Sequence, residues 1–344
     1  NQEIPDANLA ESLGRLPGVS DTSSAGEGDK VIVRGMDARY NLVSVNGVRA
    51  PSSSSDDNSV SLAGISPFMV DGIEVKKTLT PDYDADVVGG IIDLKLKDAE
   101  EGFHVNMLLQ NRFPGTLQGK TFNPLATLQL SNRFFKNKLG VTLVGNYERI
   151  NRISNRVENY VGLININPNR IDDGGVISPR PSSTFYYGDI IRERKGLSLF
   201  MDFKLENTKI TFSSFINGLD DETIDRSMTV GNPTLSKGID VSSFNTLTYI
   251  NAFSIEQKIH STKLKISAAY NKAASEKPYD YNIGQTRTFT NTELSQEARD
   301  LISGYNIGPY YAANILGSLA NDSSFYMSTL SSEANDFTED EKNG

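Results

Sequence analysis

The sequence has no cysteine, no tryptophan and only two histidines among its 344 residues. The absence of cysteine excludes disulfide frameworks, thiolate zinc sites and cysteine nucleophiles. Long apolar runs are also missing, and no stretch approaches the roughly 20 apolar residues that a membrane-spanning helix needs. A helical membrane protein is therefore excluded. A transmembrane β-barrel remains open, because its strands need only about 9–11 residues of alternating polarity.

Charges of both signs are present, but acidic residues predominate. The 34 Lys and Arg residues face 43 Asp and Glu residues, which gives a formal net charge of −9 at pH 7. Nucleic-acid-binding proteins usually carry a basic surface that neutralises phosphates, so we expect no nucleic-acid partner. The N-terminus lacks the basic and apolar regions of an export signal, so we expect any such signal to have been removed or to lie outside this sequence.

Residues that carry catalysis or hold metals are sparse. Neither His104 nor His260 neighbours a nucleophile motif, and the sequence contains no phosphate-binding loop or dinucleotide fingerprint. The alternating aspartates of residues 82–86 imitate the first half of a calcium-binding loop, but Val87 occupies the sixth position, where the sharp turn requires glycine. We therefore predict a protein that is not an enzyme and has no cofactor or metal, with a polar turn at 82–86.

The first hundred residues contain short strand and turn signals with one helix. The helix is predicted at 8–16, where three leucines recur at i, i+4 and i+7 and share one face. Asn8, followed three residues later by Glu11, fits a capping box, and Pro17-Gly18 should end the helix. Four short strands are predicted, and the second should close a hairpin at Asn46-Gly47, a dipeptide that tolerates positive φ. These strands are 31–33, 42–45, 73–75 and 92–97.

Beyond residue 103 the predicted strands become longer and alternate in polarity. In the fourth, Leu197 and Leu199 point to the face opposite Asp202, so we assign the leucines to lipid and Asp202 to a lumen, where replacement by alanine should be mild. The seven predicted strands are 103–112, 124–134, 139–149, 196–205, 209–217, 245–257 and 263–271.

The connections between these strands alternate strictly between short and long. Long, polar connections are expected at 113–123, 150–195, 218–244 and 272–344, the last with two short helices between 292 and 320. Outer-membrane barrels show the same asymmetry, with short periplasmic turns and long extracellular loops. We favour such a barrel over the alternative, a soluble β-sandwich.

Five sequence blocks resemble the plug domain of TonB-dependent outer-membrane receptors. They are LAESLGRLPGVS at 9–20, VIVRG at 31–35, LVSVNGVRAP at 42–51, ISPFMVDGIEVKK at 65–77 and VVGGIIDLKLK at 87–97. The resemblance implies an α+β plug domain at 1–98 followed, at 103–344, by antiparallel transmembrane β-barrel strands.

The family barrel has 22 strands, which seven predicted strands cannot close. We therefore expect this sequence to be part of a longer receptor, and we expect the segment that contacts TonB, normally upstream of the plug, to be absent from it. In this family the plug sits inside the barrel.

By this resemblance, the protein imports an extracellular substrate across the outer membrane of a Gram-negative bacterium by energy coupling through TonB. The alternative function is a passive surface-binding or adhesion protein. Expected partners are TonB, outer-membrane lipid, a small-molecule, oligosaccharide or peptide substrate, and, as a further candidate, a surface lipoprotein. Fold alone does not identify the substrate.

The resemblance also suggests which residues bind the substrate. The loop at 36–40 and the polar tract at 52–58 match positions that plugs present toward the extracellular side, so the candidate substrate-binding residues are Asp37, Arg39, Tyr40 and Arg49.

Arg34 and Glu74 are the candidate plug–barrel contacts, because a charge enclosed by a barrel must be paired. The alternative for both residues is an ordinary surface ion pair.

Overall fold

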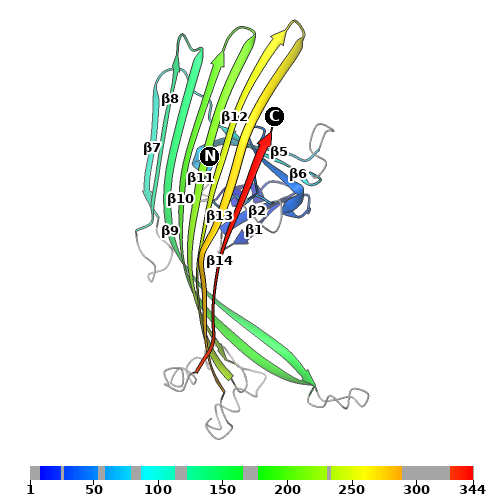
Figure 1. Ribbon diagram of the computed structural model, residues 1–344, viewed down its shortest axis with the longest axis vertical. Helices are drawn as coiled ribbons and strands as arrows, with labels where there is room; N and C mark the ends of the chain where they lie inside the picture. The colour runs from blue at the N-terminus through cyan, green and yellow to red at the C-terminus, as the bar shows by residue number, and fades with distance from the viewer. Residues whose placement is uncertain are drawn as a thin grey trace.

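The computed structural model describes residues 8–24, 27–52, 59–78, 87–112, 122–165, 177–230, 234–288 and 326–343. The described strands form sheets of two, four and eight strands. The two smaller sheets belong to residues 8–98, the plug region, and lie against the concave side of the eight-stranded long sheet (Figure 1).

The plug region combines a small mixed sheet with a hairpin and short helices. Strands β1 and β2 pair antiparallel, and the four-stranded sheet has the order β4-β3-β6-β5, with β3 parallel to β6. No helix in the described part of the chain is long and apolar enough to cross a membrane. The elements are α1 (Leu9–Gly14), β1 (Val19–Ser24), β2 (Glu27–Val33), η1 (Ala38–Tyr40), β3 (Asn41–Val45), β4 (Val48–Arg49), η2 (Pro67–Met69), β5 (Val70–Lys76) and β6 (Gly90–Leu96).

Helix α1 begins as predicted, but its capping box is incomplete. The side chain of Asn8 accepts a hydrogen bond from the backbone N–H of Ala10 at 2.7 Å, which satisfies one of the free donors of the first turn. Glu11 instead accepts from the backbone N–H of Gly28 at 3.2 Å. The glutamate therefore joins α1 to β2.

The predicted hairpin turn between β3 and β4 is confirmed. Asn46 and Gly47 both have positive φ, 51° and 81°. The buried carboxylate of Asp93 on β6 accepts hydrogen bonds from Ser44 Oγ and from the backbone N–H of Gly47, each at 2.8 Å. Asp93 therefore holds this turn against the neighbouring strand.

The long sheet is a continuous antiparallel meander in which every strand pairs with the next. Its first two strands match the prediction closely, but from β9 onward the strands continue through segments that were predicted to be loops. These segments are 150–165, 177–195, most of 218–244, and 272–288. The strands are β7 (His104–Asn111), β8 (Pro124–Phe134), β9 (Leu139–Asn165), β10 (Ile177–Lys204), β11 (Thr208–Val230), β12 (Thr234–Ile259), β13 (Thr262–Thr288) and β14 (Tyr326–Asn343).

The extended strands were missed because charged and polar residues interrupt the apolar positions of their distal outer face, where Val157 and Ile239 are nevertheless 47% and 40% exposed. The alternation that marks a half-buried strand is therefore weaker there. Strand β14 likewise occupies the acidic tail that was expected to be solvated. The short helices predicted between 292 and 320 lie outside the described residues.

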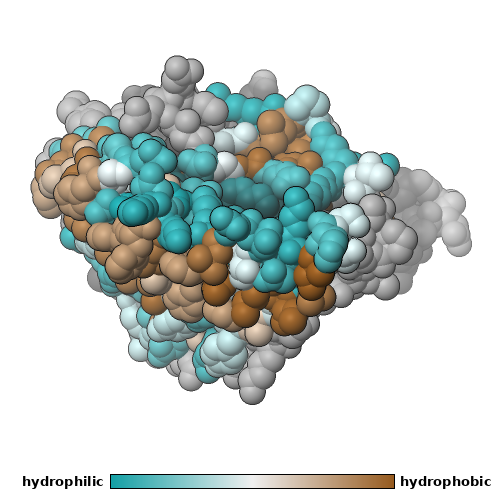
Figure 2. All heavy atoms as spheres, turned by 90° about the horizontal axis from the view of Figure 1, so that it is seen from above, coloured by the Kyte–Doolittle hydropathy of each residue, from teal (hydrophilic) through white to brown (hydrophobic). Residues whose placement is uncertain are grey.

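Near the short turns, the two faces of the long sheet differ in polarity. Apolar side chains on the outer face are strongly exposed, among them Met107 at 65% and Ile266 at 63%. Figure 2 shows hydrophobic side chains along the outer rim and hydrophilic ones around the central hollow. On the inner face, Phe200, Phe215 and Ile250 join the buried apolar core of the plug region. The outer face is thus built for lipid, and the inner face covers the plug region.

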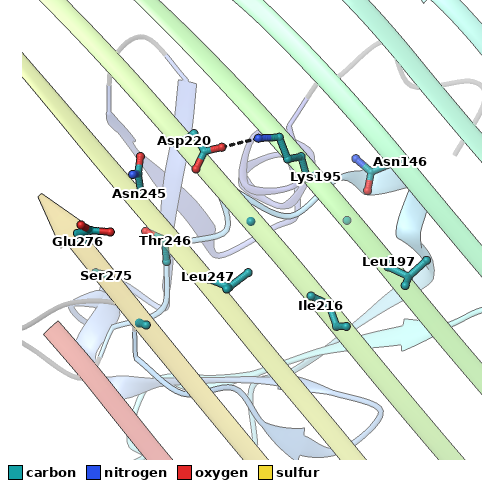
Figure 3. Close-up of a pocket in the computed structure, with 13 residues that line it drawn as sticks. Asn146, Lys195, Leu197, Ile216, Asp220, Asn245, Thr246, Leu247, Ser275 and Glu276 are labelled. Carbon is teal, nitrogen blue, oxygen red and sulfur yellow. Dashed lines mark hydrogen bonds and ion pairs between the residues drawn. The ribbon is translucent and has the colours of Figure 1, made fainter. Parts of the chain in front are cut away.

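A hollow of about 760 Å³ on the outer face lies where the surface changes from apolar to polar. Gly218 has no side chain to fill it, and Leu197, Ile216 and Leu247 line one part. On the other side Lys195 pairs with Asp220 at 2.7 Å (Figure 3).

The position of this hollow agrees with the thickness of an outer membrane. Lys195 lies nine residues from the end of β10 at Lys204. At about 3.4 Å per residue and a strand tilt of about 40°, that is a height of about 23 Å, close to the roughly 25 Å of a barrel's apolar band. The hollow therefore lies near the distal edge of the apolar band.

The first prediction concerns this boundary. Leu199 points outward about 13 Å above the short-turn end by the same estimate, near the middle of the apolar band. Replacing Leu199 with arginine should destabilise the inserted sheet by about 2–4 kcal/mol. Ile224 points outward far beyond the band, so Ile224→Arg is the control and should cost little. Urea unfolding in lipid vesicles measures both, and equal costs would contradict the assigned boundary.

The second prediction concerns packing inside the plug region. A Cβ atom at Gly90 would lie 2.8 Å from Val33 Cγ1 and 3.0 Å from the carbonyl oxygen of Lys76, whereas one at Gly72 would meet nothing within 4 Å. Gly90→Ala should therefore destabilise the plug region by about 1–3 kcal/mol through overpacking. Gly72→Ala should be tolerated. Protease protection of the plug region compares the two, and equal protection would show that Gly90 is not constrained.

Candidate functional site

One buried carboxylate of the plug region faces a cluster of arginines on the long sheet. Glu27, the first residue of β2, is only 1% exposed. Its Oε2 accepts a hydrogen bond from Arg192 Nη1 at 2.6 Å, and Arg152 and Arg194 also pair with the carboxylate. Three arginines from β9 and β10 thus converge on a single plug residue.

Strand register brings these arginines together. Arg192 and Arg194 are two residues apart on β10 and so point to the same face. Arg152 is on β9, directly opposite Ile190 of β10. Because Ile190 is two residues from Arg192, Arg152 points to the same inner face. Alternation within strands and pairing between them place all three guanidinium groups against the plug region.

Carboxylates of the sheet give two of the arginines second partners. Arg192 forms two hydrogen bonds of 2.6 Å with Asp221 on β11. Arg194 Nη1 lies 3.2 Å from Glu148 Oε1, and Arg112 also pairs with Glu148. The cluster therefore contains four arginines and three carboxylates, with one positive charge in excess.

Glu27 is held in its ionised form. Burial is the largest influence and would raise the pKa of this carboxyl, but Arg194, Arg152 and Arg192 together outweigh it and lower the pKa below its ordinary value of 4.5. A buried charge is tolerated only when it is paired, and removing one partner of a buried pair typically costs about 3–5 kcal/mol. The Glu27 cluster is therefore the main polar attachment of the plug region to the sheet.

A second set of contacts lies where the chain passes from the plug region into the sheet. Arg133 Nε donates to the carbonyl oxygen of Ala99 at 2.9 Å, and its Nη2 donates to Asp202 at 2.8 Å. Lys97 Nζ donates to Gln129 Oε1 at 3.0 Å. Because Asp202 is buried and pairs with a buried arginine, the structure leads us to expect that Asp202→Ala is destabilising rather than mild.

Three of the four predicted substrate-binding residues lie together. Asp37 caps η1 by accepting from the backbone N–H of Arg39 at 3.2 Å, and the two side chains also pair at 3.2 Å. The guanidinium of Arg39 lies 5.8 Å from the ring centroid of Tyr40. Hydrogen bonding to Arg39 lowers the pKa of Asp37. All three side chains are exposed, so they are available for contact with a ligand.

The fourth residue, Arg49, lies on β4. Its backbone carbonyl accepts a hydrogen bond from Asn271 Nδ2 on β13 at 2.7 Å, which ties β4 to the inner face of the long sheet. Of the polar tract 52–58, residues 53–58 lie outside the described part of the chain. Ser52 Oγ donates to the carbonyl oxygen of Ser59 at 3.0 Å.

The two residues predicted to contact the barrel, Arg34 and Glu74, instead contact other residues of the plug region. Arg34 is exposed and donates to the carbonyl oxygen of Lys77 at 2.9 Å. Glu74 pairs with Lys95 at 3.4 Å and with Lys76 at 3.7 Å. In the described residues these charges therefore connect strands of the plug region, as the surface-pair alternative proposed, and Glu27 makes the contact with the sheet.

Sequence reasoning missed Glu27 for an identifiable reason. The residue lies in a tract rich in glycine and serine, which is typical of a flexible loop, and its arginine partners lie in a segment predicted to be a loop. A possible signal was the alternation Arg192-Glu193-Arg194, whose period of two places both arginines on one face if the segment is a strand.

Comparison with known proteins places the plug region in a described family. Residues 1–91 match the model of the TonB-dependent Receptor Plug Domain. The chain is 34% identical over 95 residues to the vitamin B12 transporter BtuB of Photobacterium profundum, covering 26% of this chain and 15% of that protein.

Similar solved structures include the siderophore receptor PirA of Acinetobacter baumannii, with 12% identity and a TM-score of 0.40 over 83% of this chain and 55% of that one. They also include the ferric citrate transporter FecA, with 16% identity and a TM-score of 0.39 over 85% of this chain and 47% of that one. The chain thus spans about half the length of these solved receptors.

The third prediction concerns the Glu27 cluster. Glu27→Gln leaves three arginines without their shared counter-charge and should weaken docking of the plug region by about 3–5 kcal/mol. Because the folded-state pKa of Glu27 is lowered, its stabilisation is present above pH 4.5 and is lost as the pH falls through the folded-state value. Protease protection of the plug region, followed against urea and pH, measures both effects.

The control for this prediction is Glu74→Gln. Glu74 is about half exposed and pairs only with lysines of the plug region, so its loss should cost at most about 1 kcal/mol. Unchanged docking in Glu27→Gln at pH 7, or an acid dependence as steep as in the unmodified protein, would contradict the role given to Glu27.

Proposed function

The chain carries the plug domain of a TonB-dependent receptor, and from this premise we propose that it is part of an outer-membrane receptor that imports an extracellular substrate by energy coupling through TonB. Its location is the outer membrane of a Gram-negative bacterium, in keeping with the exposed apolar band of the long sheet. The relatives are transporters and receptors.

The Glu27 cluster is the observation that supports a movable plug. Arg192 keeps Asp221 as a partner when the plug region withdraws, and Arg194 keeps Glu148. Withdrawal therefore leaves neither arginine as an isolated buried charge, which lowers the cost of breaking the contact. A plug held this way is secure at rest and releasable under force.

The position of Glu27 in the chain supports mechanical coupling. Glu27 begins β2, which pairs with β1 directly after α1, so the cluster holds the N-terminal elements of the plug region. In this proposal, TonB pulls on the receptor upstream of residue 1 and loads these elements first. Displacing β2 removes the carboxylate from the arginines and opens a path along the inner face of the sheet.

Substrate capture is assigned to exposed residues of the plug region and to the distal inner face of the long sheet. Asp37, Arg39 and Tyr40 form one exposed group, and Arg49 lies where β4 meets β13. A surface lipoprotein remains a candidate partner on the extracellular side. A passive adhesion protein is the alternative function, and it requires no plug movement.

The fourth prediction tests plug movement without knowledge of the substrate. Ala63 is 3% exposed and its carbonyl oxygen contacts Arg194, so a cysteine there should be shielded while the plug is docked. These 344 residues contain no cysteine, and labelling of the unmodified full-length receptor gives the background against which the Ala63→Cys variant is read. In intact cells, a membrane-impermeant maleimide should label it when the membrane is energised and much less after a protonophore.

Two further cysteine variants serve as controls. Val157 is 47% exposed on the distal part of β9, so Val157→Cys should be labelled with or without the protonophore. Asn137 lies in the short turn between β8 and β9, so Asn137→Cys should stay unlabelled in intact cells. Labelling of Ala63→Cys that does not respond to the protonophore would favour the passive alternative.

A further inference from the structure

The inner face of the long sheet continues beyond the Glu27 cluster, where β10 to β13 extend away from the plug region (Figure 1). Arg192 and Asp221 point inward, because Arg192 binds Glu27 and Asp221 binds Arg192. On β10, residues an even number of positions from Arg192 share that face, and on β11 the same holds for residues an even number of positions from Asp221. Neither strand contains a bulge in this region. The register therefore identifies the side chains that line the distal inner face.

One row across this face consists of hydroxyl groups. Thr184 and Thr229 lie within hydrogen-bond distance at 2.9 Å, and Ser236 and Thr286 do so at 3.0 Å. Thr229 is directly opposite Ser236, so the four residues form a continuous row over four strands. Hydroxyl groups both donate and accept, so this row matches a ligand that does the same.

The next row places an aromatic ring beside open backbone. Tyr186 pairs with Ser227, and the following positions on β12 and β13 are Gly238 and Gly284. Arg156 from β9 lies 4.0 Å from the ring centroid. Beside the ring this row thus carries only the small Ser227 side chain, followed by two glycines. Ser227 Oγ lies over Gly238, because a Cβ atom there would be 2.5 Å from it, so a flat ligand on this side of the ring would lie above Ser227.

The third row carries negative charge. Asp225 lies directly opposite Asp240, and Asp240 accepts a hydrogen bond from the Asn282 amide. Like charges directly opposite each other destabilise a sheet. Among the described residues neither carboxylate forms an ion pair with a cation, and no group of acidic or histidine side chains there fits a metal ion. The two charges remain available as strong hydrogen-bond acceptors.

We propose that this distal inner wall, formed by Thr184, Tyr186, Asp225, Ser227, Ser236 and Asp240, is the binding site for a neutral oligosaccharide. The proposal rests on the import function and names its substrate class. The apolar face of a sugar ring packs on the side of Tyr186 that faces away from Arg156, above Ser227. Its hydroxyl groups donate to Asp225 and Asp240, in charge-assisted hydrogen bonds that are stronger than neutral ones.

The same charges select against other substrates. An anionic ligand, such as a ferric chelate or an acidic sugar, would have to approach two carboxylates that no described cation neutralises, and like-charge juxtaposition disfavours wrong partners. Arg156 does not reverse this balance, because it pairs with Glu158 at 2.9 Å. The wall therefore favours uncharged, hydroxyl-rich ligands.

The test is binding of two matched sets of oligosaccharides to the purified full-length receptor. One set is neutral, and the other has the same lengths and linkages but carries uronic acids or sulfates. A neutral oligosaccharide should bind at least tenfold more tightly than its anionic counterpart. Tyr186→Ala should weaken that binding about tenfold or more, while Tyr186→Phe, which keeps the ring, should retain most of it.

Two variants make the test specific. Tyr187 is the next residue on β10 and points to the outer face, so Tyr187→Ala should leave the affinity unchanged. Replacing both Asp225 and Asp240 with asparagine should reduce the ratio of the affinity for the neutral set to the affinity for the anionic set. Unchanged gel mobility of the folded receptor confirms that each variant inserts normally.

Three results would overturn the proposal: no neutral oligosaccharide binds, the anionic set binds more tightly, or Tyr187→Ala weakens binding as much as Tyr186→Ala. Failure of the import function gives a different result. In that case the oligosaccharide still binds with the expected dependence on Tyr186, but labelling of Ala63→Cys does not respond to the protonophore.

Discussion

The burial of the Glu27 carboxylate is the constraint on which the rest of the structure depends. A carboxylate that is 1% exposed is stable only with charge-bearing partners, and here it is shared among three arginines. The register of β9 against β10 meets that requirement, because it places all three arginines on the inner face of these strands. Glu148 and Asp221, the neighbouring carboxylates of the sheet, then share the excess positive charge.

This arrangement divides the long sheet into two environments. Between the short turns and the level of Lys195, the outer face is apolar and the inner face packs on the plug region. Beyond that level the inner face is largely polar, whereas the outer face mixes charged residues with exposed apolar ones such as Val157 and Ile239. One continuous set of strands thus provides an apolar outer band near the short turns and a polar inner face beyond the plug region.

The proposed import cycle follows from the different strengths of these contacts. Phe200, Phe215 and Ile250 pack against the plug core and stabilise its docking, but this apolar contact does not depend on the orientation of the groups. The Glu27 cluster is directional, and its arginines keep partners on the sheet after the carboxylate leaves. A ligand on the distal inner wall would lie just beyond this cluster, at the entrance to the path that plug withdrawal opens.

Local sequence patterns determined the elements whose stability is local. The start of α1, the Asn46-Gly47 turn and the bounds of β8 follow from capping, positive φ and strict alternation, and the five plug motifs indicated the family. Tertiary structure alone decided the length of β9 to β13 and the partners of Glu27, Arg34 and Glu74. The distal halves of these strands mix charged and apolar residues on their outer face, which weakens the period of two. The partner of a buried charge depends on residues more than a hundred positions away, because only the paired register brings them within hydrogen-bond distance.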